Sequence, residues 1–146
     1  MLTGLALRSK QHWGYDDAFI DACRAELTLT SETLERAVVT VAEDGPRILG
    51  FSVLGGDAPE VEVEWLFVEP VDIGRGVGRA LWDRAVSAAT ELGAEGIRVE
   101  SDPHAVCFYE RVGAVQIGTV ASGSITGRRN PLMRFDVAAH RRGARP

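Results

Sequence analysis

The stretch VEPVDIGRGVGRAL, residues 68–81, decides the fold of this chain. Residues 60–68 begin as alternating apolar and acidic side chains and end in a continuous apolar run. This pattern predicts a strand that enters a core covered on both faces. Pro70 ends the strand, and from residue 76 to residue 92 the apolar side chains recur at helical spacing over a wide face, as in a helix that packs on a sheet. The stretch therefore predicts a buried strand, a glycine-rich turn and a helix in direct succession.

The three alternating glycines of this turn predict an anion site at the start of the helix. Glycines lack the Cβ atoms that keep an anion from the backbone, and the free N–H groups of a first helical turn point at whatever lies there. Arg75 and Arg79 add positive charge at the rim. The spacing excludes a dinucleotide fingerprint, whose last glycine would fall on Arg79 or Leu81, and a P-loop, which needs Lys followed by Ser or Thr. A tight strand–helix connection without a ligand is the alternative.

On either side of this unit the pattern predicts short helices, a hairpin, a second strand–helix pair and two closing strands. The expected helices span 3–9, 17–28, 76–92 and 103–112, and the expected strands span 36–42, 47–54, 60–68, 96–101, 115–120 and 132–137. Asp102 is expected to cap the helix that begins at Pro103. This order indicates a mixed α/β fold in a single domain, residues 1–139, followed by a disordered arginine-rich tail, residues 140–146.

Composition restricts the class of protein. The 146 residues are 45% hydrophobic and suit one globular domain. No apolar run approaches the roughly 20 residues of a membrane-spanning helix, and no secretory signal is recognised, so no membrane partner is expected. Acidic residues outnumber basic ones by 21 to 16, which argues against nucleic acid as a partner and mildly favours cationic substrates. Cys23 and Cys107 stand far apart and the histidines are scattered, so we expect no disulfide framework, no metal site and a reducing, cytoplasmic location.

Two motifs resemble signatures of the GNAT superfamily of N-acetyltransferases. Val68-x-Pro70 followed by Gly74-x-Gly76-x-Gly78 is similar to its acetyl-CoA signature. Residues 102–114, DPHAVCFYERVGA, resemble its second signature, an Asn-led helix that carries Phe-Tyr and ends in Gly. The resemblance covers residues 36–137. It implies a mixed, mostly antiparallel sheet of six to seven strands, splayed at a central parallel pair and flanked by about four helices.

Three features depart from the family pattern. Ile73 stands where members usually carry Arg or Gln, which removes one polar phosphate contact. Asp102 replaces the usual Asn and adds a negative charge near the cofactor. The usual first strand is missing, because the chain opens on an expected helix. Either the strand was lost, which leaves a sheet edge that a second subunit could cover in a homodimer, or the start is truncated.

The resemblance implies transfer of the acetyl group of acetyl-CoA to a primary amine of a small molecule or peptide, by direct attack in a ternary complex and without a metal. Backbone groups around Phe67 and Val68 would hydrogen-bond the pantetheine amides, as a missing sheet neighbour would. The glycine-rich turn would bind the diphosphate. The expected cofactor contacts are Phe67, Val68, Gly74, Arg75, Gly76, Val77, Gly78, Arg79, Asp102 and Phe108.

Such a reaction needs a proton acceptor, because an alkylammonium with a pKa of about 10.4 must lose a proton before it attacks. Glu62 and Glu64 are expected to point the same way as Leu66 and Val68 along the strand that holds the acyl arm. We expect Glu64 to be the base, since it lies one pleat nearer the acyl end, and Glu62 to face the substrate. The alternative is that both belong to an ordinary solvated face.

Tyr109 is the expected general acid. The resemblance implies that the tyrosine of the Phe-Tyr pair lies beside the sulfur of coenzyme A, whose thiolate needs a proton. A core aromatic with its hydroxyl on a backbone carbonyl is the alternative. The residues expected on the acceptor side are Trp13, Tyr15, Glu62, Ser124 and Arg128.

Two other functions stay open at this point. The chain could be a catalytically idle fold that binds coenzyme A as a sensor or partner module, or it could be a non-enzymatic interaction domain. Binding of coenzyme A separates the last of these from the others, and thiol release with amines separates an enzyme from an idle module.

Overall fold

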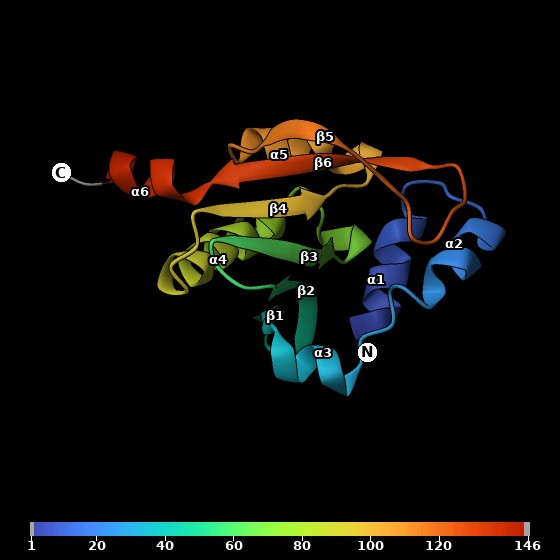
Figure 1. Ribbon diagram of the computed structural model, residues 1–146. Coiled ribbons are helices and arrows are strands. Elements are labelled where there is room, and N and C mark those ends of the chain that lie inside the picture. The colour runs from blue at the N-terminus through green and yellow to red at the C-terminus, as the bar shows by residue number, and fades with distance from the viewer. Residues whose placement is uncertain (1, 145–146) are drawn as a thin grey trace.

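The computed structural model describes residues 2–144, which form a six-stranded sheet with helices on both faces (Figure 1). The strand order is β1-β2-β3-β4-β6-β5, and among these neighbours β3 and β4 alone run parallel. The strands are β1 (Val38–Asp44), β2 (Arg47–Gly55), β3 (Glu60–Val68), β4 (Gly96–Glu100), β5 (Val115–Ala121) and β6 (Arg129–Asp136). The helices are α1 (Leu2–Gln11), α2 (Asp17–Arg24), α3 (Ser31–Arg36), α4 (Val77–Glu91), α5 (Val106–Arg111) and α6 (Val137–Ala144), with 3-10 turns η1 (Pro70–Asp72) and η2 (Pro103–Ala105). The expected mixed α/β fold is confirmed, with six α-helices in residues 2–144 instead of about four.

Strand β3 lies in the middle of the molecule because β2 and β3 carry apolar side chains on both faces. Val61 and Val63 of β3 belong to the same buried core as Trp82 of α4. On the other face, Phe51 of β2 is buried together with Leu5 of α1. Burial of side chains of this size contributes about 1.5–3 kcal/mol each. The sheet is therefore fixed between two helical layers, with α4 and α5 on one side and α1 on the other.

The parallel strands β3 and β4 separate after a short ladder. Their last paired residues are Glu62 and Arg98. Beyond that point β3 continues to Val68 while it is paired with β2 alone. One side of residues 63–68 is thus left without a strand neighbour, and the central pair splays as the family resemblance implied.

A β-bulge at Glu64 interrupts the side-chain alternation of β3. Val63 and Trp65 pair with consecutive residues of β2, so Glu64 is an extra residue between them. Beyond the bulge, Leu66 packs with Val63 in the core under α4, whereas Trp65 packs on the face of α1.

This bulge overturns one expectation from the sequence. Glu62 does not share a face with Leu66 and Val68. Its neighbours Val61 and Val63 are buried under α4 together with Leu66, so the side chain of Glu62 points to the opposite face of the sheet, where α1 lies. The expectation assumed an uninterrupted pleat, and the extra residue at Glu64 removes that continuity.

Helix α3 lies where the sequence pattern predicted the start of the first hairpin strand. Its N-cap is Thr30, whose side chain accepts a hydrogen bond from the backbone N–H of Thr33. The strand accordingly begins at Val38 instead of residue 36. No strand precedes β1 in residues 2–144, which agrees with the expected lack of the family's first strand.

Helix α6 corrects the prediction of a disordered tail. Residues 140–144 continue a helix that starts at Val137, a fully buried residue, and the side chain of Asp136 accepts a hydrogen bond from the N–H of Ala139. Burial of Val137 in the core and this cap stabilise a helix that the sequence pattern of the segment alone predicts only weakly. Residues 145–146 lie outside the described residues. No helix within residues 2–144 has the length and apolar character needed to cross a membrane.

Candidate active site

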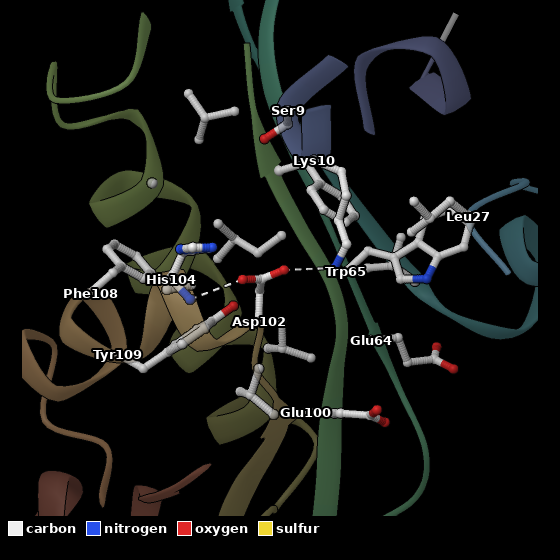
Figure 2. Close-up of a pocket in the computed structure, with 18 of the residues that line it drawn as sticks. Ser9, Lys10, Leu27, Glu64, Trp65, Glu100, Asp102, His104, Phe108 and Tyr109 are labelled. Carbon is white, nitrogen blue, oxygen red and sulfur yellow. Dashed lines mark hydrogen bonds and ion pairs between the residues drawn. The ribbon is translucent and has the colours of Figure 1, made fainter. Parts of the chain in front are cut away.

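A single groove of about 840 Å³ joins the features that the sequence singled out. It runs from the glycine-rich turn before α4, along the split between β3 and β4, to the N-terminal helices and the β5–β6 loop. Figure 2 shows Glu64 and Trp65 on one side of this groove, with Asp102 and Tyr109 on the other.

The glycine-rich turn carries a row of backbone donors with no protein partner. Gly74 and Gly76 both have φ of +85°, and a Cβ at either position would meet no atom within 4 Å. The N–H of Arg75 bonds to the carbonyl of Asp72, and that of Ala80 bonds to the carbonyl of Gly76. Within residues 2–144 no protein acceptor takes the N–H groups of Gly74, Gly76, Val77, Gly78 and Arg79. With the positive end of the α4 dipole behind them, these groups and the open space in front of them fit a diphosphate.

A buried carboxylate fixes the conformation of the turn. Asp72 is 1% exposed and pairs with Arg47 of β2, while Arg75 lies within 3.6 Å of it. Arg79 lies 3.6 Å from Asp83. Because Arg75 and Arg79 are exposed and such surface pairs are weak, both arginines can turn toward a bound phosphate.

Gly78 lets the two signature helices approach each other. A Cβ at this position would lie 3.2 Å from the ring of Phe108 on α5 and 3.8 Å from the side chain of Val68. Phe108 therefore packs directly against the first turn of α4 and lines the groove beside the glycine-rich turn.

The unpaired side of β3 exposes the backbone groups of Leu66 and Val68. The N–H of Glu69 bonds to the carbonyl of Leu49 in β2 at 2.8 Å, so by alternation the backbone of Phe67 is also directed to β2. The N–H and C=O groups of Leu66 and Val68 face the other way, into the split. The expected backbone contact therefore shifts from Phe67 to Leu66, which the sequence analysis missed, while the side chain of Phe67 still lines the groove.

Tyr109 is buried and lines the groove. Its ring packs edge-to-face on Trp82 at 5.7 Å and on Phe108 at 5.1 Å. Within residues 2–144 no hydrogen bond acts on its hydroxyl, and no fully buried polar side-chain atom lacks a partner, so the hydroxyl is open to the groove and is not held by a backbone carbonyl. Burial, and then the charge of Asp102, raises the pKa of Tyr109 above its usual value, so the hydroxyl stays protonated and can donate.

Asp102 is the centre of an ionic network between three distant segments. Its carboxylate accepts hydrogen bonds from Lys10 Nζ at 2.8 Å, from the Tyr15 hydroxyl at 3.0 Å and from the His104 backbone N–H at 2.9 Å, the expected cap. Arg128 approaches it to 3.5 Å. Burial alone would raise the pKa of Asp102, but the hydrogen bonds from Lys10 and His104 outweigh it and lower the pKa. The negative charge that departs from the family pattern is thus neutralised inside the protein.

Comparison with known proteins identifies the fold family. A family model described as an acetyltransferase (GNAT) domain matches residues 9–123. This chain belongs to the GNAT acetyltransferase family. Among solved structures, nourseothricin acetyltransferase is 27% identical, with a TM-score of 0.63, 69% of this chain covered and 65% of that chain spanned. A GCN5-related N-acetyltransferase from Rhodopseudomonas palustris has a TM-score of 0.75 at 23% identity, over 92% of this chain and 87% of that one. The PaiA N-acetyltransferase from Thermoplasma acidophilum, solved in complex with coenzyme A, has a TM-score of 0.74 at 18% identity, over 92% and 90%. No curated protein matches.

In this GNAT protein the expected aromatic residues of the acceptor side have different places. Trp13 lines the groove and stacks on His104, with ring centroids 5.4 Å apart. Tyr15 does not line the groove: its ring stacks on Phe19 at 3.9 Å and its hydroxyl supports Asp102 from behind. Tyr15 was expected to contact the acceptor, but in the structure its hydroxyl contacts Asp102 and Arg128, which line the groove in its place.

The β5–β6 loop lies at the end of the groove next to the N-terminal helices. Ser124 and Arg128 both line it. The hydroxyl of Ser124 donates to the carboxylate of Glu26, which follows α2, and Arg128 reaches the Tyr15 hydroxyl at 3.0 Å. The loop is therefore tied to the N-terminal helices across the mouth of the groove.

The two candidate bases on β3 differ in their partners. Glu64 lines the groove, but its carboxylate accepts two hydrogen bonds from Arg36, at 2.9 and 3.0 Å. Glu62 also lines the groove and has no ion-pair partner in residues 2–144. Burial, followed by the charges of Glu64 and Glu100, raises the pKa of Glu62. Within the described residues no three His, Cys, Asp or Glu side chains are placed to hold a metal ion.

Proposed function

We propose that this GNAT protein transfers the acetyl group of acetyl-CoA to a primary amine by direct attack. One observation carries the proposal: a continuous groove joins the bare N–H groups of the glycine-rich turn, the unpaired edge of β3 and the hydroxyl of Tyr109. These three features follow the order of the diphosphate, the pantetheine arm and the thioester in acetyl-CoA. The co-substrate supplies an activated acyl group, and the protein's own residues take up the proton of the amine and stabilise the departing thiolate.

Glu62 is the residue best suited to take the proton from the amine. At pH 7 an alkylammonium with a pKa of about 10.4 must be deprotonated at a cost of about 4.6 kcal/mol. A carboxylate with a raised pKa is a better proton acceptor than an ordinary one. Glu62 forms no ion pair within residues 2–144, and the charges of Arg98 and Arg36 offset only part of the rise in its pKa. The sequence favoured Glu64, whose carboxylate is engaged by Arg36. We therefore assign the role of general base to Glu62 instead of Glu64.

Tyr109 is the proposed hydrogen-bond donor to the departing sulfur. Its hydroxyl lies in the groove wall without a protein partner in residues 2–144, and its raised pKa keeps it protonated at neutral pH. A donor of this kind stabilises the thiolate as the C–S bond breaks.

Surplus negative charge supports an amine as the acceptor. Glu26, Glu62 and Glu100 line the groove, and none of them forms an ion pair within residues 2–144. Of the Lys and Arg side chains that line the groove, Lys10 and Arg128 are engaged by Asp102, Arg36 by Glu64 and Arg79 by Asp83, which leaves Arg111 as the one without an ion pair in residues 2–144. A positively charged small molecule or peptide N-terminus fits this balance.

Calorimetric titration with acetyl-CoA, followed by thiol-release assays, tests the proposal. The acceptor panel contains polyamines, aminoglycosides, amino acids and peptide N-termini. We expect one-to-one binding of acetyl-CoA and amine-dependent release of thiol. Binding without thiol release for any amine would indicate an idle coenzyme A module, and no binding at millimolar acetyl-CoA would contradict both.

A further inference from the structure

Lys10 is the only lysine of the chain, and it lies inside the proposed acetyl-transfer groove. The other positively charged side chains are arginines. Their guanidinium groups stay protonated and do not react as amines. Apart from the chain's N-terminus, Lys10 therefore carries the only amine of the protein.

The amine of Lys10 lies in the same groove as Tyr109, the residue proposed to assist the departing sulfur. The Lys10 side chain is 17% exposed and lines the same groove as Trp65 and Tyr109. Its Nζ lies 2.8 Å from a carboxylate oxygen of Asp102. Figure 2 shows the side chain extending from α1 into the space between β3 and Asp102, with this contact as a dashed line.

The surroundings hold the ammonium group in place. The rings of Tyr15 and Phe19 lie with their centroids 5.5 and 5.7 Å from Nζ, so the group is enclosed by aromatic faces as well as by Asp102. A fixed nucleophile beside a bound acyl donor reacts as if at high effective concentration.

We propose that Lys10 is itself an acetyl acceptor, modified in cis by acetyl-CoA bound in the groove of the same molecule. This inference rests on the proposed function, because it needs acetyl-CoA in that groove. The Nζ loses a proton through Asp102 to solvent and attacks the thioester carbonyl. The new bond is the C–N bond of an amide, the bond that breaks is C–S, and coenzyme A leaves as a thiolate that takes up a proton. No oxidant or metal is needed.

The modification changes the ionic network. Acetylation removes the charge of Lys10, so Asp102 keeps only Arg128 as a cationic partner, together with the hydroxyl of Tyr15. The acetylated side chain also adds a neutral amide to the groove at the point where Lys10 now extends.

Intact mass measurement of the purified protein with acetyl-CoA tests this inference. We expect addition of one acetyl group (about 42 Da) with a rate that saturates in acetyl-CoA and falls when coenzyme A competes. Trypsin does not cleave after acetyl-lysine, so the label should appear on a peptide spanning Ser9–Arg24 and not on the N-terminus. For a reaction in cis, the rate constant should stay the same when the protein concentration is changed about tenfold.

Two controls separate this reaction from chemical acetylation. Lys10→Arg keeps a cation beside Asp102 but offers no amine, so residues 9–24, which trypsin divides after position 10 in this variant, should carry no label. Thermal unfolding checks its fold. The urea-unfolded wild-type chain should be labelled at least about tenfold more slowly than the folded protein.

The outcomes distinguish this proposal from the proposed function. Labelling of Lys10 no faster than in the unfolded chain, in a protein that binds acetyl-CoA and releases thiol with an amine, overturns the inference and leaves the function standing. Absence of acetyl-CoA binding overturns both.

Discussion

A Glu62→Gln substitution tests the chemistry of the groove with little change in its shape. Glu62 makes no ion pair in residues 2–144, so its amide leaves no protein charge unpaired, and the free energy of unfolding should change by less than about 0.5 kcal/mol. The catalytic loss should be much larger, because a positioned general base contributes about 100-fold to 10,000-fold. We expect kcat to fall at least about 100-fold, which corresponds to about 2.7 kcal/mol in the barrier.

The matched control is Glu64→Gln on the same strand. It removes the charge that pairs with Arg36 and the smaller of the two main causes that raise the pKa of Glu62, but it leaves the Glu62 carboxylate and its burial in place. In thiol-release assays with the best amine of the panel, kcat of this variant should stay within about tenfold of wild type. Acetyl-CoA affinity, measured by calorimetry, should be the same for both variants and the wild type.

The pH profile gives a second readout for Glu62. The base works in its deprotonated form, and its pKa is raised from 4.5 by burial and by neighbouring carboxylates. In the wild type, kcat/KM should therefore fall as the pH drops through this raised pKa, and the acidic limb should disappear in Glu62→Gln. A Glu62→Gln enzyme with wild-type kcat and an unchanged acidic limb, beside an inactive Glu64→Gln enzyme, would refute this reasoning and return the base to Glu64.

Three further substitutions test other parts of the site. Tyr109→Phe should lower kcat more than about tenfold with little change in acetyl-CoA affinity, and an unchanged kcat would remove Tyr109 from the mechanism. Asp102 has a lowered pKa, so its stabilisation is present above its unfolded-state pKa and is lost as the pH falls through the folded-state value. Asp102→Asn should accordingly lower the free energy of unfolding, measured in urea, by about 1–3 kcal/mol at pH 7 and by progressively less below pH 3.8. An equal loss at pH 7 and below pH 3.8 would contradict the pairing of the Asp102 carboxylate with Lys10. Gly76→Ala and Gly93→Ala both place a Cβ in open space at positive φ, and each variant should lose about 1–2 kcal/mol of stability. Only Gly76→Ala should weaken acetyl-CoA binding, by about tenfold or more in calorimetry. Equal affinities of the two variants would argue against the turn as the diphosphate site.

The strand, turn and helix around residues 68–81 could be predicted from the sequence because their causes are local. Pro70 ends the strand, and the positive φ of Gly74 and Gly76 is a conformation that glycine adopts without strain. The direction of the freed N–H groups then follows from the start of α4.

The faces of β3 could not be predicted, because they depend on a partner strand. The extra residue at Glu64 appears only when β3 is paired with β2, and alternation of side chains gives no sign of it. The same pairing decides that Leu66, not Phe67, turns its backbone into the split.

The ionic network could not be predicted from the sequence either, because its members come together only in the folded chain. Lys10 and Asp102 lie 92 positions apart, and Arg36 and Glu64 lie 28 apart. No periodic pattern links such positions. The one available signal for Lys10 was that it is the only lysine in a chain whose other basic residues are arginines.

Backbone amide NMR of the glycine-rich turn tests the central claim most directly. The account predicts that coenzyme A shifts the N–H signals of Gly76, Val77 and Gly78, which have no protein acceptor in residues 2–144. Pantetheine, which lacks the diphosphate, should leave these signals in place while it perturbs those of Leu66 and Val68. Shifts of the turn that are the same with both ligands, or no shift of the turn with coenzyme A, would contradict the account.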